Sequence, residues 1–181
     1  MKPTVSSLGD SILDAWSTNA RVTALLVGQL PADLWEASVP GSPRRTIRMI
    51  AAHLHNSRRA WIRTLGRPHG VEVPAAVDRF RVSRPELVRA LKQSARGIAG
   101  LLSLGLGHDG AIPPTPLYVW RNLPLDVGHV LAYFVAHEGH HRGQLVLLAR
   151  QLGHRLPAEV TNSLWMWKTR SARLRGAGTR V

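Results

Sequence analysis

Cysteine is absent from this chain of 181 residues, which excludes disulfide bonds, thiolate nucleophiles and thiolate metal ligands together. Any metal site must therefore use histidine, carboxylate or water ligands. Long apolar runs are missing too, since no segment approaches the roughly 20 apolar residues that cross a bilayer. The first residues lack the basic and then apolar plan of a signal peptide. We therefore expect a cytoplasmic protein with no membrane partner.

Lysine and acidic residues are scarce. The chain has 3 Lys and 21 Arg against 11 acidic residues, and its formal charge is +13. A charge of this size favours nucleic acid or other anionic partners. However, the arginines are scattered, with local clusters only at Arg44, Arg45 and Arg48 and between Arg170 and Arg180. This distribution indicates an arginine-biased composition, and a nucleic-acid-binding or stress-response protein with a structural metal site is the alternative hypothesis.

Apolar residues recur at the helical period in four long segments, which predicts an all-α fold, a four-helix bundle in one domain over residues 1–172. Ser42, Ser83 and Asp126 are the predicted N-caps of the second, third and fourth helices. Glycine and proline crowd residues 105–124 and predict a long crossover connection between helices three and four. Residues 173–181 are expected to form a basic, disordered tail. The predicted helices cover residues 8–30, 43–65, 84–104 and 127–152, followed by a short C-terminal helix over about 159–173.

The densest chemistry lies in the fourth predicted helix, in the segment HEGHHRGQ at residues 137–144. At about 100° per residue, His137 and His141 share one apolar stripe of the helix, whereas His140 points away from it. Imidazoles four residues apart on a helix are neighbours and can bind one ion at about 2.0–2.1 Å. Burying two such rings without good partners would cost several kcal/mol. This pair therefore predicts a metal site rather than two structural histidines.

A third ligand should come from another helix. The second predicted helix offers His53 and His55 on opposite flanks of its apolar stripe, and helical phase does not choose between them. Arg58 falls near the centre of the same stripe, where a guanidinium needs a carboxylate, a carbonyl or a bound anion. A structural ion pair and a substrate contact are both consistent with that position.

The segment also matches HExxH, the zinc protease signature in which Glu138 would act as general base. A protease of this kind needs a third ligand, for which Glu159 lies at a suitable distance downstream. The chain shows none of the strands that present a peptide edge in such enzymes. The protease hypothesis is therefore weaker than the three-histidine one.

Three segments together resemble the DinB-like (DinB/YfiT) superfamily, in this order along the chain: TIRMIAAHLHNSRRAW, HEGHHRGQLVLLARQLG and LWMWK. The resemblance spans about residues 8–170. It implies that the metal ligands are His53, His137 and His141, and that the ion is zinc, nickel, iron or manganese. It also implies a four-helix bundle that is often a homodimer.

The resemblance further implies a metal-dependent transferase or hydrolase. Characterised members of the superfamily use the ion to bind a low-molecular-weight thiol and transfer it to an electrophile, so a small thiol is the implied substrate. Three neutral imidazoles leave positions open for water or substrate, as in catalytic sites. His140 is a departure from the family pattern, because it could replace His141 at a spacing that still chelates.

Overall fold

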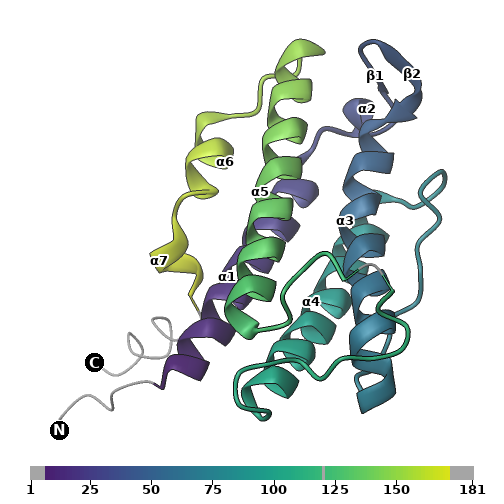
Figure 1. Ribbon diagram of the computed structural model, residues 1–181. Helices are drawn as coiled ribbons and strands as arrows, with labels where there is room; N and C mark the ends of the chain where they lie inside the picture. The colour runs from purple at the N-terminus through teal and green to yellow at the C-terminus, as the bar shows by residue number, and fades with distance from the viewer. Residues whose placement is uncertain (1–6, 120, 172–181) are drawn as a thin grey trace, which may run out of the picture.

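Four long helices form the body of the molecule in the computed structural model, which describes residues 7–119 and 121–171 (Figure 1). Helices α1 and α5 run parallel to each other and antiparallel to α3 and α4. Side-chain contacts between residues at the same height along the bundle show these directions. The predicted all-α bundle is confirmed. The long helices are α1 Leu8–Gln29, α3 Ile47–Trp61, α4 Arg84–Leu106 and α5 Val127–Gln151.

Side-chain caps begin these helices. The Ser83 hydroxyl accepts from the Glu86 N–H while the Glu86 carboxylate accepts from the Ser83 N–H, which is a complete capping box. Asp126 accepts from the His129 N–H at 3.0 Å and caps α5. Both residues are therefore N-caps, as predicted.

The start of the second long helix was predicted wrongly. Residues 38–46 form a small antiparallel hairpin, β1 Ser38–Val39 with β2 Ser42–Thr46, instead of the first turn of a helix. Gly41 at the turn has φ +72°, which glycine adopts without strain. The cap is Thr46, whose hydroxyl accepts from the Met49 N–H at 3.3 Å. After Trp61 the chain continues as η1 Ile62–Gly66, a π-helical turn, and η2 Arg67–His69, a 3-10 turn.

Two long connections join the last three long helices. Because α3 and α4 are parallel, residues 70–83 must return along the bundle. Asn56 binds both the N–H and the C=O of Val77 in this segment, and the Arg59 Nε–H donates to the Pro74 carbonyl at 3.0 Å. The predicted long connection between α4 and α5 is also present, and an isolated bridge between Ala111 and Asp126 closes it.

The C-terminal segment packs against α1. Where one helix was predicted over residues 159–173, the structure has two short ones, α6 Ala158–Ser163 and α7 Trp167–Arg170. The predicted tail at 173–181 lies outside the described residues. A further short helix, α2 Ala32–Trp35, precedes the hairpin. Across the described residues, no helix is long and apolar enough to span a membrane.

Two apolar clusters fill the bundle. One lies toward the hairpin end and contains Leu26, Leu34 and Leu145, and the other lies toward the start of α5 and contains Trp16 and Phe134. Buried polar side chains occur where the two clusters meet. That level of the bundle also carries the three predicted ligands.

Candidate metal centre

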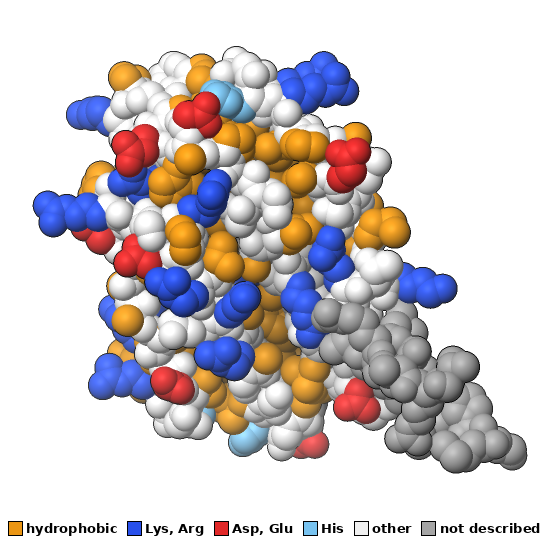
Figure 2. Space-filling model, turned by 180° about the vertical axis from the view of Figure 1, so that it is seen from behind, with side chains coloured by type: hydrophobic (Ala, Val, Ile, Leu, Met, Phe, Trp, Pro, Cys, Tyr) orange, Lys and Arg blue, Asp and Glu red, His pale blue; other side chains and the backbone are white. Residues whose placement is uncertain are grey.

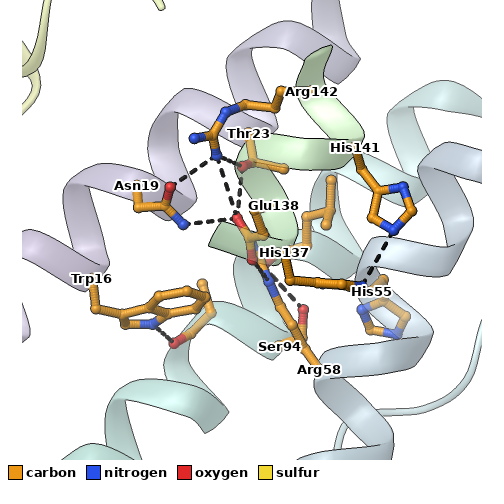
Figure 3. Close-up of polar contacts among 12 residues, drawn as sticks. Trp16, Asn19, Thr23, His55, Arg58, Ser94, His137, Glu138, His141 and Arg142 are labelled. Carbon is orange, nitrogen blue, oxygen red and sulfur yellow. Dashed lines mark hydrogen bonds and ion pairs between the residues drawn. The ribbon is translucent and has the colours of Figure 1, made fainter. Parts of the chain in front are cut away.

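Helices α3 and α5 bring His53, His137 and His141 together. His137 and His141 lie one turn apart on α5, and His53 faces them from the antiparallel α3. The Nε2 atom of His137 lies 3.2 Å from the Nε2 atom of His53. It lies at the same distance from the Nε2 atom of His141 (Figure 3). One ligand atom from each of the three residues lies within 4.8 Å of the other two. The structure thus assembles the three residues that the resemblance implied.

The separations between these nitrogens fit a shared ion. Three nitrogens at about 2.0–2.1 Å from a tetrahedral zinc ion would lie about 3.3–3.4 Å apart, close to the 3.2 Å from the His137 Nε2 atom to each of the other two. His53 is exposed, His137 is half-buried and His141 is buried. The cluster therefore has one solvent-facing side, at His53.

All three imidazoles favour the neutral form that binds metals. Burial, together with smaller contributions from the neighbouring rings of His141 and His53, lowers the pKa of His137 to about 4. Burial is also the main cause that lowers the pKa of His53, with a smaller effect from Arg45. Burial likewise lowers the pKa of His141, and the hydrogen bond to Gln144 opposes this effect only in part. Near neutral pH the lone pairs are therefore available without displacing a proton.

Gln144 fixes the tautomer of His141. The Nδ1 atom of His141 lies 2.8 Å from the Gln144 Oε1 atom, and since an amide oxygen only accepts, Nδ1 carries the proton. The Nε2 atom then presents its lone pair to the centre of the cluster. Hydrogen-bonded partners of this kind orient metal-binding histidines and increase their basicity.

The other histidines that could compete as ligands lie elsewhere. His55 is fully buried on the far flank of α3, with its ring nitrogens 2.9 Å from the Ala90 carbonyl and 2.8 Å from the Ala75 carbonyl. It ties the 70–83 connection to α4, so of the two histidines that phase left open only His53 reaches the cluster. His140 is exposed and its ring stacks edge-on against His141, outside the group of converging nitrogens.

A buried charge network lies directly behind the histidines. The Glu138 carboxylate accepts from the Arg58 Nε–H at 2.6 Å, from Asn19 at 2.9 Å and from Thr23 at 2.6 Å (Figure 3). Arg142 lies 3.8 Å from the same carboxylate and donates to both Asn19 and Thr23 at 2.8 Å. The network joins α1, α3 and α5.

Arg58 belongs to this network and is closed off from solvent. Its side chain is 1% exposed, it donates to the Leu91 carbonyl at 2.9 Å, and its guanidinium lies 5.0 Å from the centre of the Trp16 ring. Of the two interpretations of Arg58, the structural ion pair is confirmed. The interpretation as an anion contact for substrate is wrong, because the residue is closed off from solvent.

Asn19 and Thr23 were missed by the sequence reasoning. They lie one turn apart on the buried face of α1, and Glu138 and Arg142 have the same spacing on α5. Two polar pairs with i, i+4 spacing on the buried faces of two different helices were the available signal, since such groups need partners inside the core.

The position of Glu138 excludes the protease hypothesis. The Glu138 carboxylate is fully buried and its oxygens are occupied by α1 and α3, so it cannot act as general base at the cluster. Glu159 lies on α6 and is not part of the cluster. The HExxH match therefore comes from two histidines of the cluster and one structural carboxylate.

Comparison with protein families supports the resemblance drawn from the sequence. The model of the DinB family matches residues 119–170, which include α5 with His137 and His141, and the two short C-terminal helices. Neither the curated proteins nor the solved structures gave a match.

Proposed function

We propose that this chain is a metal-dependent enzyme of the DinB-like superfamily whose ion is held by His53, His137 and His141. The observation that carries the proposal is the convergence of three imidazoles from two antiparallel helices, with the His137 Nε2 atom 3.2 Å from the Nε2 atoms of His53 and His141. Zinc, nickel, iron and manganese all accept imidazole ligands, so the donor set does not select one of them.

The chain contributes orientation and access. Gln144 holds the His141 ring with its lone pair inward, and the buried Glu138 network fixes α5 against α1 and α3. The exposed edge at His53 leaves a path by which a small substrate reaches the cluster. A bound divalent ion would lower the pKa of a coordinated water or thiol and so supply the nucleophile at neutral pH.

We assign the substrate to the low-molecular-weight thiols, transferred to an electrophile, with hydrolysis by an activated water as the competing reaction. Support for the thiol comes from the superfamily resemblance. The cluster itself supports either reaction, because it offers three protein ligands and an open side. Comparing thiol consumption with water-dependent hydrolysis on the metal-loaded protein distinguishes the two.

Metal content tests the site. We expect about one equivalent of ion in protein purified without an affinity tag or nickel resin, and loss of that ion in the His137→Ala, His141→Ala double variant. His140→Ala is the matched control, since it removes an adjacent imidazole that lies outside the cluster. Native protein that takes up no divalent ion, or equal loss of metal in the control, would overturn the proposal.

The Gln144→Ala variant tests the role of the outer hydrogen bond. Without the Oε1 acceptor, the His141 ring loses its fixed tautomer and orientation. We expect the affinity for the ion to fall by about 10–100-fold while the fold is retained. A competition titration against a chelator of known affinity measures this change, and an unchanged affinity would show that Gln144 does not orient the ligand.

A further inference from the structure

A groove of about 500 Å³ runs between α1 and α4 on the side of the bundle away from the three histidines (Figure 2). Small residues on both helices leave space for the groove between them. These are Ala20, Ala24 and Gly28 on α1, and Ala95 and Ala99 on α4. The exposed surface of the groove is mainly apolar. Volumes of this size are typical of pockets that enclose one small ligand.

Cations surround this apolar floor. Arg21, Lys92 and Arg96 line the groove, and none of its lining residues is acidic. Figure 2 shows the same arrangement, with apolar surface between side chains of Lys and Arg. Arg21 is held in place, because its guanidinium donates to the Ser17 hydroxyl at 2.8 Å and to the Arg170 carbonyl at 2.5 Å.

Positive charge also lies behind the floor. Trp16 and Leu91 line the groove, and on their inner side they contact Arg58 through its guanidinium. The buried network there holds two cations, Arg58 and Arg142, against the single carboxylate of Glu138, so it carries a net charge of +1. The field in the groove is therefore positive from the rim and from beneath.

We propose that this groove binds an amphipathic anion, a small molecule with an apolar chain or ring system that ends in a carboxylate. The apolar part would lie along the alanine and glycine faces, and the carboxylate would pair with Lys92 and Arg96 at the rim. A second copy of the chain is a poor occupant, because two such faces in contact would bring six lining cations together with no acidic lining residue between them. The proposal is independent of the metal site.

Calorimetric titration with dodecanoate, below the concentration at which it forms micelles, tests the proposal. We expect saturable binding of one molecule per chain and no saturable binding of dodecyltrimethylammonium, which has the same chain and the opposite charge. The Lys92→Glu, Arg96→Glu double variant should weaken binding at least tenfold. Arg63→Glu, at an exposed cation outside the groove, is the control and should bind as the native protein does.

A second pair of variants fills the groove. A phenyl ring at position 24 or at position 99 would occupy the apolar floor, so both Ala24→Phe and Ala99→Phe should abolish binding while the circular dichroism spectrum is retained. Two sites are used because either variant alone could disturb helix packing. Equal binding of the anionic and cationic probes, or no binding of dodecanoate, would overturn the proposal. So would a native dimer, measured by sedimentation, that either groove-filling variant dissociates, since the groove would then be an interface between copies.

Discussion

Glu138→Gln is the substitution that most directly tests the buried network. The carboxylate is fully buried and compensates Arg58, whose side chain is 1% exposed, and Arg142, which is mostly buried. A neutral amide of the same size removes that charge. It also replaces one accepting oxygen with an NH2 group, which would face either the Arg58 Nε–H or the donors of Asn19 and Thr23. The variant thus keeps the packing and loses both the charge balance and one hydrogen-bond match.

The size of the effect follows from the burial of the pair. Removing one partner of a buried ion pair leaves the other charge uncompensated and costs about 3–5 kcal/mol. For a chain of this length, 1 kcal/mol corresponds to roughly 2–4 °C in melting temperature. We therefore expect Glu138→Gln to melt about 6–20 °C below the native protein. That loss would be a large part of the roughly 5–15 kcal/mol that stabilises a typical domain.

Thermal and urea unfolding, followed by circular dichroism in the presence of a chelator, measure this change without a contribution from bound metal. Glu36→Gln is the matched control. Glu36 pairs with Arg48 but its side chain is 76% exposed, so its loss should change stability by less than about 1 kcal/mol. Equal and small effects of the two substitutions would refute the argument that the buried network stabilises the bundle.

Three further perturbations have defined outcomes. In metal-free protein the pKa of His137 is lowered to about 4 from the ordinary 6.5, so the unfolded chain binds more protons, and stability should fall as pH is lowered from about 6.5 to 4; a flat profile in urea unfolding would contradict this. A Cβ on Gly97 would lie 2.5 Å from the end of the Ile62 side chain, so Gly97→Ala should destabilise the protein by about 1–3 kcal/mol. Gly143 has open space around it, so Gly143→Ala should stabilise the helix by about 0.5–1 kcal/mol. The same unfolding assay measures both variants, and a gain in stability for Gly97→Ala would show that Ile62 moves freely. With the free ion at about 100 times its dissociation constant, removing it with a chelator should lower the free energy of unfolding by about 2.7 kcal/mol, or the melting temperature by roughly 5–11 °C in calorimetry. An unchanged melting temperature would mean that the ion does not stabilise the fold.

Periodicity and capping chemistry predicted most of the fold. Ser83 followed by Glu86, and Asp126 ahead of an apolar repeat, define helix starts through local hydrogen bonds alone, and both starts are confirmed. The start of α3 was wrong because Ser42 followed by Pro43 fits a helix cap and a short edge strand equally well. Pairing with the strand Ser38–Val39 favours the edge strand over the helix cap, and this pairing cannot be read from the residues around Ser42 alone.

The candidate site, like the fold, could be predicted from the sequence only in part. His137 and His141 share a face because of helical geometry, so their proximity could be derived from spacing. The choice of His53 over His55 depends on how α3 is rotated against α5 and where the 70–83 connection runs, which phase does not determine. Arg58 was predicted to need a carboxylate, a carbonyl or an anion as partner, but the carboxylate lies 80 residues away in sequence, inside a segment that was interpreted as metal-binding.

The Glu138 network also sets which turn of each helix faces which. Asn19 and Thr23, one turn apart, meet Glu138 and Arg142, also one turn apart, and Arg58 enters from the third helix. Sliding α5 by one turn, about 5.4 Å, would separate every one of these donors from its acceptor. The same slide would carry His137 away from His53 by more than twice the length of a bond from nitrogen to a metal ion. Glu138, the residue next to His137, thus fixes the axial position of α5 against α3 as closely as a shared ion requires.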